Sequence, residues 1–399
     1  MTSTRTDPIV VAGTGHVGLI AAIALGQHLE NVVSLGVIPT GTDKRTTALM
    51  MPAIRFLQRI GLWDSIAPHA APIGSMRILD GTNRLVRSPV VTFEASEIDE
   101  DAFGYNIPNA ALTKTLSNAL KQSPVRHVAA SATHYHPVDN AMAVEASDGS
   151  VFTANIVIAA DGRSSLAREA AGISARTWQY NQTAVVLSFS HTRDHHDIST
   201  EFHTEHGPFT QVPLAGKRSS LVWVTTPAHA AELLDLNAEQ LAVRVEERMQ
   251  SMLGAVTIDV EAQAWPLSGL VPNAFARNRV FLAGESAHVF PPIGAQGLNL
   301  GVRDVETLLD TLPSDGSDLG AAPVVSAYNR KRSPDIIART GAVDALNRSL
   351  LSDFLPVQMV RSGGLELLRT FSPLRSFLMR EGLRPGSGFR WPRREGKRA

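Results

Sequence analysis

The chain has 399 residues, of which 44% are hydrophobic and 19% charged, which fits a globular protein of two domains or one elaborated domain. Its 37 Lys and Arg residues balance 38 Asp and Glu residues, so no global positive charge predicts binding to nucleic acid. The sequence has no cysteine, which excludes disulfides, thiolate metal sites and cysteine nucleophiles. No apolar run approaches the ~20 residues of a membrane-spanning helix, and Met1–Pro8 is too short for a targeting peptide. We therefore expect a cytoplasmic protein.

Histidine spacing and the basic C-terminal tail are less informative. Thirteen histidines are present, but the pairs at 134/136, 195/196 and 203/206 fall in predicted strands or loops, and none forms the helical HExxH pattern. We predict no metal site. The segment Arg390–Arg398 is rich in Arg and Lys. It fits either a solvated chain end or a weak contact with anionic lipid, and charge alone leaves both readings open.

The beginning of the chain predicts a strand, a tight turn and a helix. Ile9–Ala12 is a short apolar run, typical of a buried parallel strand. A helix is predicted over Leu19–Leu29 and a second strand over Val32–Leu35, which together make a βαβ opening. Ala48–Ile60 predicts a further amphipathic helix that ends before Gly61.

The middle of the chain predicts a sheet. Met76–Phe93 and Ala184–Val224 are rich in alternating and β-branched segments, which indicates an antiparallel sheet with turns at Gly81, Gly207-Pro208 and Gly216. Between these stretches the sequence predicts a helix over Asn109–Gln122, a hairpin that closes at Asp148-Gly149, and a buried strand over Asn155–Ala159.

The C-terminal third returns to a strand, turn and helix pattern. Val280–Ala283 predicts a strand, a loop rich in Gly and Pro follows, and Leu298–Leu312 predicts a helix. Ala322–Glu381 is mostly helical and includes an apolar stripe over Leu350–Leu368. Segments of the nucleotide-binding type thus occur at both ends of the chain, so the two domains are expected to be interleaved.

The first glycine motif predicts a phosphate-binding turn. Gly13 allows the chain to turn sharply off the strand, and Gly15 allows the backbone to approach a pyrophosphate. Gly18 allows the helix to pack closely on the sheet, and the helix N-terminus then faces the anion. The letters alone form a weak pattern, but its position directly after a buried strand favours dinucleotide binding over a plain tight turn.

One expected partner is missing from this fingerprint. An Asp or Glu at the end of the second strand usually binds the ribose hydroxyls. Here Gly36 stands at that place. Either Asp43 or Glu30 substitutes for it, or the adenosine end is held loosely.

Two later stretches present a carboxylate at the end of a predicted strand, where open α/β sheets bind ligands. Asp161-Gly162 follows the strand that ends at Ala159, and Gly284-Glu285 follows the strand that begins at Val280. The second stretch continues with a Pro-Pro corner and a Gly-x-x-Gly turn that begins a helix. A helix N-terminus directed at a flavin would stabilise the negative charge that reduction creates.

Together these stretches resemble the flavoprotein aromatic hydroxylases, and most of all the ubiquinone-biosynthesis hydroxylases, over residues 9 to 380. The resemblance rests on the three glycine-containing stretches and on Asp43–Leu49, Gly61–Asp64, Gly104–Asn109, Gly207–Leu214, Ser219–Trp223, Gln296–Asp304 and Tyr328–Arg332. It implies an α/β fold of the para-hydroxybenzoate hydroxylase type, with a Rossmann-like FAD-binding domain, an antiparallel sheet domain for substrate and C-terminal helices.

The domain boundaries implied are as follows. Residues 1–75, 105–180 and 265–340 would form a discontinuous FAD-binding domain. Residues 76–104 and 181–264 would form the sheet domain, and 341–399 a C-terminal helical region with the basic tail.

The resemblance also implies site residues. Gly13, Gly15 and Gly18 would bind the FAD pyrophosphate, Arg45 would lie beside the flavin, and Asp161 would serve both FAD and transient NAD(P)H. Gly284 and Glu285 fall where the family has a Gly-Asp pair on the ribityl chain, so the acid here is longer by one methylene. Pro292, Gly294, Gln296, Gly297 and Asn299 would edge the isoalloxazine. His288, His203 and Tyr105 are more simply structural, and no catalytic acid or base is assigned.

The implied reaction is hydroxylation of a phenolic ring by a flavin C4a-hydroperoxide. Only one complete dinucleotide fingerprint exists, so NAD(P)H is expected to visit, reduce the flavin and leave. The implied substrates are O2 and a polyprenylphenol intermediate of ubiquinone, which would enter between the sheet domain and the C-terminal helices. Peripheral association with a membrane or a biosynthetic complex stays open. Two alternatives are a monooxygenase acting on another aromatic or polyketide substrate, and a non-catalytic subunit with a flavoprotein fold.

Overall fold

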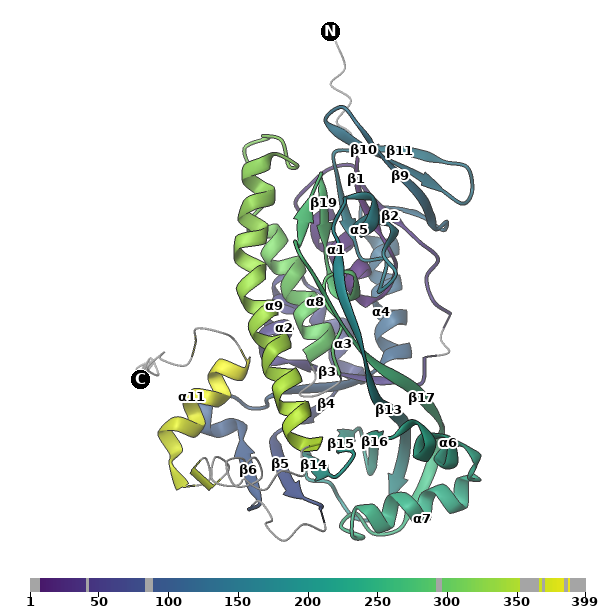
Figure 1. Cartoon of the computed structure of the whole chain (residues 1–399), viewed down its shortest axis with the longest axis vertical. Coiled ribbons are helices and arrows are strands. Elements are labelled where there is room, and N and C mark those ends of the chain that lie inside the picture. Colours follow the sequence, from purple (N-terminus) through teal and green to yellow (C-terminus); the bar gives the residue numbers. More distant parts are fainter. Residues whose placement is uncertain are drawn as a thin grey trace.

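The computed structural model describes residues 8–40, 43–82, 89–291, 296–351, 366–367, 370–383 and 387. The fold is mixed α/β, with two large sheets at opposite ends of the molecule (Figure 1). The basic tail and most of the apolar stripe over Leu350–Leu368 lie outside the described residues.

The first large sheet has six strands in the order β18-β19-β12-β1-β2-β8. Their bounds are β1 Ile9–Ala12, β2 Val32–Leu35, β8 Arg126–Val128, β12 Ile156–Ala159, β18 Ala276–Arg277 and β19 Val280–Leu282. The strands are parallel except for the antiparallel edge strand β18. The predicted βαβ opening is confirmed, and β1, β2, β12 and β19 are buried along their whole length.

Three helices pack on this sheet or on its first helix. The first is α1, His16–Gly26, in which every residue from Gly18 to Leu25 is buried. It begins three residues before the predicted start at Leu19, because the chain turns into the helix directly after Gly15. Next to α1 lie α4, Asn109–Gln122, whose predicted bounds are confirmed, and α8, Gln296–Leu309.

The second large sheet has seven strands in the order β17-β13-β16-β15-β14-β5-β6. Their bounds are β5 Ser75–Asp80, β6 Val91–Glu94, β13 Ala175–His191, β14 Ile198–Thr204, β15 Gly207–Leu214, β16 Arg218–Thr225 and β17 Val256–Pro272. The predicted antiparallel sheet is confirmed with one correction, because β5 and β14 pair in parallel. The turn placed at Gly207-Pro208 is also corrected: β15 already begins at Gly207, and residues 205–206 form the turn.

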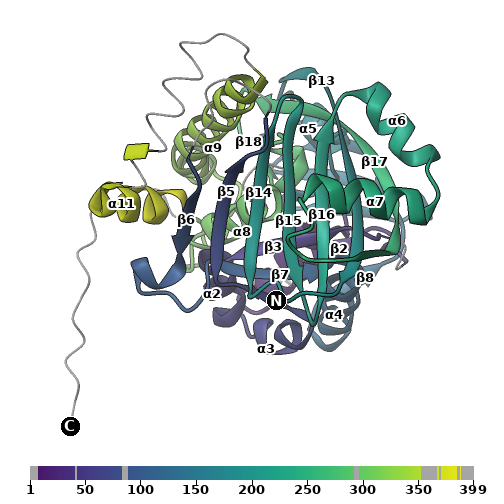
Figure 2. The ribbon, with the colours of Figure 1, turned by 90° about the horizontal axis from the view of Figure 1, so that it is seen from below.

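The two faces of the seven-stranded sheet meet different partners. The outer face packs on α6, Pro227–Asp235, and α7, Ala238–Arg248, as Figure 2 shows. Phe202, Phe209 and Trp223 belong to that outer core. The inner face meets the rest of the molecule, since Ser220 contacts Thr46 and Asn106.

Two small sheets complete the fold. The strands β3 Thr46–Met50, β4 Ala71–Ile73 and β7 Gly104–Pro108 form one, and β9 Ala132–Val138, β10 Ala141–Ala146 and β11 Val151–Ala154 form the other. The hairpin predicted at Asp148-Gly149 is the β10–β11 turn. The helix predicted over Ala48–Ile60 is wrong at its start. Residues 46–50 pair with β7, and α2 covers only Met51–Arg59, with Pro52 in its first turn.

Long strands and C-terminal helices connect the two ends of the molecule. The strands β13 and β17 each have 17 residues and run from one end to the other (Figure 1), so the predicted boundaries at 180 and 265 fall inside them. The helix α9, Ala322–Leu351, runs beside them, and α11, Ser372–Leu383, lies against the end of the sheet that contains β5 and β6.

Candidate functional site

The first glycine turn fits closely around its own backbone. A Cβ on Gly13 would lie 2.1 Å from the carbonyl oxygen of Ala160, and Gly13 has a φ of +107°. A Cβ on Gly18 would lie 2.0 Å from the carbonyl oxygen of Gly13. Gly15 is different, since nothing lies within 4 Å of its Cβ position. It caps α1 without a side-chain hydrogen bond, so the helix N-terminus faces open space, as a bound pyrophosphate requires.

At the end of β2, the Thr14 side chain lies close to the position where an acidic residue in place of Gly36 would have its Cβ. Gly36 has a φ of +156°, and a Cβ there would lie 2.8 Å from Cγ2 of Thr14. The Thr14 hydroxyl donates to the carbonyl of Val37 over 2.7 Å. Glu30 precedes the beginning of β2 and therefore lies at the wrong end of the strand to replace Gly36.

Asp43 is not free to replace Gly36 either. Its two carboxylate oxygens accept from Nε and NH2 of Arg45 at 2.8 Å each, and one also accepts from the Asn109 amide over 2.9 Å. Burial raises the pKa of the Asp43 carboxyl, but these hydrogen bonds outweigh it and hold the pKa at about 2. The Arg45 guanidinium lies over the ring of Trp265, 4.5 Å from its centroid. Arg45 is thus fixed between an acid and an aromatic ring.

Asp161 lies at the carboxyl end of β12, as predicted. Burial raises the pKa of its carboxyl, although Oδ2 accepts from the backbone N–H of Ala167 over 3.2 Å. Its other oxygen, Oδ1, is buried and has no hydrogen-bond partner among the described residues. A buried acceptor without a partner costs about 1–3 kcal/mol, so this atom is suited to a ligand hydroxyl or a water.

Glu285 comes together with residues from two other parts of the chain. Its carboxylate accepts from Nε of Arg163 over 3.0 Å, and its charge helps to raise the pKa of Arg45 after the larger effect of Asp43. The side chain is 56% exposed. Arg45, Arg163 and Glu285 therefore form one charged group near the carboxyl ends of β12 and β19.

The N-terminus of α8 is tied to β3 by Asn299. Its amide donates to the carbonyl of Ala48 and accepts from the N–H of Met50, both over 2.8 Å. We therefore assign Asn299 a positioning role. Among the described residues nothing lies within 4 Å of the Cβ position of Gly297, and Gln296 begins the helix. Pro292 and Gly294 lie outside the described residues.

A buried ion network lies behind the second glycine turn. Asp304, which is fully buried, accepts from the N–H of Gly284 over 2.8 Å and from Nε of Arg332 over 2.7 Å. Nε2 of His288 lies 2.8 Å from the same carboxylate. Burial raises the pKa of Asp304, but the charges of Arg332 and His288 outweigh it and keep the pKa low. His288 thus belongs to this buried network.

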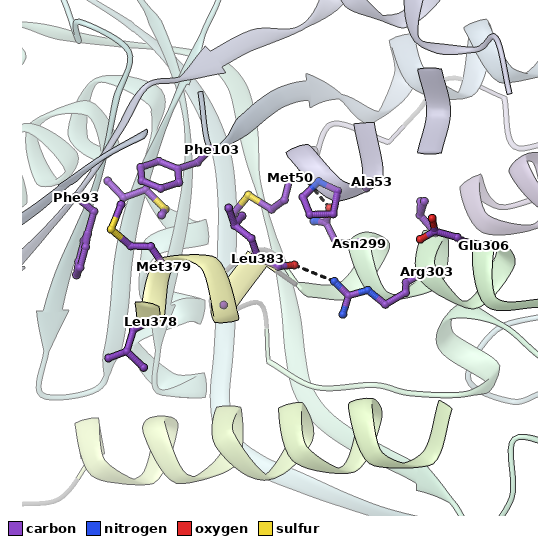
Figure 3. A pocket seen from close by; sticks show the side chains of 14 residues that line it. Met50, Ala53, Phe93, Phe103, Asn299, Arg303, Glu306, Leu378, Met379 and Leu383 are labelled. Carbon is purple, nitrogen blue, oxygen red and sulfur yellow. Dashed lines mark hydrogen bonds between the residues drawn. The ribbon is translucent and has the colours of Figure 1, made fainter. Parts of the chain in front are cut away.

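A cavity of about 270 Å³ opens beside Asn299 (Figure 3). It lies between α2, α8, α11 and the inner face of β5 and β6, and most of its lining is apolar. Phe93, Phe103 and Met379 line one end, and Met50 and Asn299 line the other. The polar groups Arg303 and Glu306 also border it. Arg303 donates to the carbonyl of Leu383 over 2.9 Å, which ties α8 to α11.

These observations fit FAD. The open helix N-terminus at Gly15 suits the pyrophosphate, and the orphaned oxygen of Asp161 suits a ligand hydroxyl. Gly297 leaves the backbone at the beginning of α8 accessible to a flat ring. The residues predicted from the two ends of the chain thus border one region.

Some participants in this region were not assigned a role from the sequence. Asn109, Asp304 and Arg332 occur in segments that resemble the family, but nothing local shows that they pair with Asp43, Gly284 or each other. Trp265 falls in a strand without a motif. Only the family likeness of their segments could have drawn attention to the first three.

Comparison with known proteins agrees with this geometry. The family model described as FAD binding domain matches residues 6–340. Ubiquinone hydroxylase UbiL of Rhodospirillum rubrum is 32% identical over 95% of this chain and 90% of its own. The 3-demethoxyubiquinol 3-hydroxylase of Escherichia coli is 30% identical over 92% of this chain and 95% of its own.

Solved structures confirm the fold. p-Nitrophenol 4-monooxygenase PnpA from Pseudomonas putida superimposes with a TM-score of 0.77 at 20% identity, over 95% of this chain and 98% of that one. The Diels-Alderase PyrE3 superimposes with a TM-score of 0.72 at 18% identity, over 95% of this chain and 80% of that one, so the fold alone does not define a reaction. The match to the family model and the hydroxylase relatives define the family instead. This chain belongs to the FAD-binding family of flavoprotein aromatic monooxygenases.

Proposed function

We propose that this protein hydroxylates the ring of a polyprenylated phenol, an intermediate of ubiquinone biosynthesis. The observation that carries the proposal is the apolar cavity between α2, α8 and α11. It begins at Met50 and Asn299, beside the predicted isoalloxazine edge, and extends between Phe93 and Met379. A ring near the flavin could thus place an isoprenoid tail among apolar side chains, where each buried CH2 contributes about 0.8 kcal/mol.

The residues of this chain have separable tasks in that reaction. FAD, when bound, supplies the activation of O2 for transfer of a hydroxyl group to the ring. The open N-terminus of α1 would bind its pyrophosphate, and Gly284 and Glu285 would lie along its ribityl chain. Asn299 fixes the beginning of α8 against β3. The apolar walls of the cavity exclude water from the reacting ring.

Two finer statements stay predictions. NAD(P)H is expected as a transient reductant, because the sequence contains only one complete dinucleotide fingerprint. Association with a membrane or a biosynthetic complex is supported by exposed apolar side chains at the C-terminal end, Leu367, Phe371 and Leu378. No helix in the described part of the chain is long and apolar enough to cross a membrane.

The experiment that tests the proposal compares phenols that differ only in tail length. Met379, which is 8% exposed and lines the cavity, is changed to Trp to fill the space. With NADH or NADPH supplied, Met379→Trp should raise KM for a phenol with two prenyl units about tenfold or more. This increase corresponds to roughly two CH2 groups of the tail that are no longer buried. KM for the same phenol without a tail should stay within about twofold, because a ring beside Asn299 does not reach Met379.

Leu234→Trp is the matched control, since Leu234 is exposed on α6 at the outer face of the sheet. It should change neither KM. Equal effects of Met379→Trp on both phenols would show that the cavity does not bind the tail. A wild-type enzyme that hydroxylates neither phenol would contradict the proposed substrate class.

A further inference from the structure

A polar cluster with no role assigned above lies on the inner face of the seven-stranded sheet. Nε2 of His203 lies 3.0 Å from Oε1 of Glu201, and the hydroxyl of Thr210 donates to Oε2 of Glu201 over 3.2 Å. The side chain of His203 is 6% exposed and that of Glu201 is 19% exposed. A carboxylate and an imidazole are thus held together on this face.

Strand register shows which way Glu201 points. Neighbouring side chains on a strand alternate between faces, and Phe202 belongs to the outer core under α6 and α7. Glu201 therefore points inward. It pairs with Thr210, which pairs with Val222. The inner face is also the one on which Met76 and Phe93 line the apolar cavity.

The cross-strand row that contains Glu201 borders free space. Val186, Val222, Thr210 and Glu201 follow one another across four strands, and all four are partly exposed. In the row nearer the start of β13, Ala184, Val224 and His203 are buried. The row of Glu201 is therefore accessible from the space between the sheet and the rest of the molecule.

Hydrogen bonding within the cluster leaves capacity for a ligand. Because a carboxylate only accepts, Nε2 of a neutral His203 carries the proton that it donates to Glu201. The other ring nitrogen, Nδ1, is buried and has no partner among the described residues. The one other described hydrogen bond to Glu201 comes from the neutral hydroxyl of Thr210. Among the described residues, other charged groups toward this face are Asp80, opposite His203, and Asp344 of α9, which accepts from Tyr180. Arg45 also lies toward it, over the ring of Trp265, which pairs with Ala184.

We propose that Glu201, positioned by His203, is the catalytic acceptor for the ring hydroxyl of the substrate and makes the site specific for phenols. The inference rests on the proposed function, since it concerns the same ring. In the part of the chain that the structure describes, neither Arg nor Lys bonds to Glu201 or His203, so a neutral phenol that donates a hydrogen bond fits the pair better than an anionic carboxylate. The apolar neighbours Val186 and Val222 suit the faces of an aromatic ring.

The proton moves as follows. When a ring carbon gains an electrophilic hydroxyl group, the phenol oxygen becomes strongly acidic, so a carboxylate beside it can accept its proton. The phenol O–H bond breaks and a Glu201 O–H bond forms, which leaves a ring carbonyl. As the ring becomes aromatic again, the C–H bond of the hydroxylated carbon breaks, its electron pair returns to the ring, and its proton passes to solvent water. The carbonyl oxygen then takes back the proton from Glu201, and the pair is regenerated.

The test uses the FAD-loaded enzyme and 4-nitrophenol, a probe whose neutral and ionised forms absorb at different wavelengths. Wild-type enzyme should bind the neutral form preferentially, because the Glu201 charge disfavours a phenolate beside it. Glu201→Gln keeps the shape and removes the charge, so the pKa of the bound probe should fall by about one unit or more. The same variant should lower kcat for a phenolic substrate on the order of 100-fold.

Glu205→Gln is the matched control. Glu205 lies in the turn of the same hairpin, 4.0 Å from Arg248 of α7, and its replacement should leave the bound pKa and kcat unchanged. Thr210→Val provides a change of opposite sign. Without the Thr210 hydroxyl the carboxylate is more negative, so the pKa of the bound probe should rise. If Glu201→Gln lacks native circular dichroism or does not bind flavin, the pKa of the probe bound to Thr210→Val tests the inference instead.

The outcomes are distinguishable from those of the proposed function, because probe ionisation needs neither turnover nor a tail. An equal bound pKa in wild type, Glu201→Gln and Thr210→Val would overturn the inference, as would wild-type enzyme that does not bind the probe at millimolar concentration. A bound pKa that moves as expected in an enzyme inactive on prenylated phenols would retain the acceptor and reject the substrate.

Discussion

The two glycine turns at the cofactor site are held in place by different forces. The turn of Gly13, Gly15 and Gly18 is fixed by close backbone packing, with carbonyl oxygens about 2 Å from the positions that Cβ atoms would take. The turn at Gly284 is fixed from behind by Asp304, a buried carboxylate that also binds Arg332. The first turn depends on shape, whereas the second depends on charge that is compensated only in the folded protein.

This difference explains what could be predicted from sequence. Gly18 packs on the carbonyl of Gly13 within the motif, and Gly13 has a positive φ, so the motif shows these roles directly, although the closest neighbour of Gly13 is the distant Ala160. The partners of the second turn are distant: Asp304 and Arg332 are 28 residues apart, and Asn299 bonds Met50 across 249 residues. No local pattern predicts such pairs, and only the resemblance to a family pointed to their segments.

The largest effect is expected from breaking the charge-based turn. Asp304→Ala leaves the Arg332 guanidinium, only 2% exposed, without its main partner. Removing one member of a buried ion pair costs about 3–5 kcal/mol, so the free energy of unfolding of the FAD-free protein should fall by that amount. Urea denaturation measures it.

Asp318→Ala is the control for this loss. Asp318 also pairs with an arginine, Arg279 at 2.6 Å, but its side chain is 43% exposed. Exposed ion pairs contribute about 0–1 kcal/mol, so this variant should unfold at nearly the wild-type urea concentration. Similar losses for both variants would mean that burial does not distinguish the two ion pairs.

The shape-based turn should respond to single methyl groups, with a smaller effect. Gly18→Ala places a methyl group 2.0 Å from a carbonyl oxygen, and overpacking of this kind costs about 1–3 kcal/mol of stability. Gly15→Ala meets no atom within 4 Å, so the FAD-free protein should be as stable as wild type. Its methyl group would instead face the pyrophosphate, and the Kd for FAD should rise about tenfold or more. Fluorescence titration with FAD, beside urea denaturation, separates the two effects.

Parts of the fold were predicted for the same local reason as the first turn. The strands that end at Ala12 and Ala159 are short apolar runs, and α4 was placed correctly from its spacing. The helix over Ala48–Ile60 was drawn too long because Ala48, Leu49 and Met50 are apolar and also suit a helix. Their pairing with β7 is a tertiary contact that overrides this preference.

The smallest expected effect concerns the missing acid at Gly36. The Thr14 side chain packs against Gly36. A Cβ at position 36 would lie only 2.8 Å from Cγ2 of Thr14. Gly36→Glu alone should therefore weaken FAD binding, because the new side chain meets Thr14. Thr14→Gly with Gly36→Glu removes the side-chain contacts and provides a carboxylate for the ribose hydroxyls, although the backbone N of residue 14, 3.2 Å away, and the φ of +156° remain unfavourable.

The double variant should bind FAD about tenfold more tightly than Gly36→Glu alone, since a hydrogen bond to a charged group contributes about 1.5–3 kcal/mol and both side-chain ordering and the positive φ of residue 36 offset part of it. Thr14→Gly alone should bind FAD no more tightly than wild type, because it only removes the bond to Val37. FAD titration of the four proteins measures the coupling between the two positions. Additive effects would mean that Thr14 does not replace the acid sterically, and that the adenosine end is bound elsewhere. A positive coupling would show that this chain lacks the ribose carboxylate because the Thr14 side chain occupies its place. It would also show that the shape-based turn accepts either a threonine at position 14 or an acid at position 36.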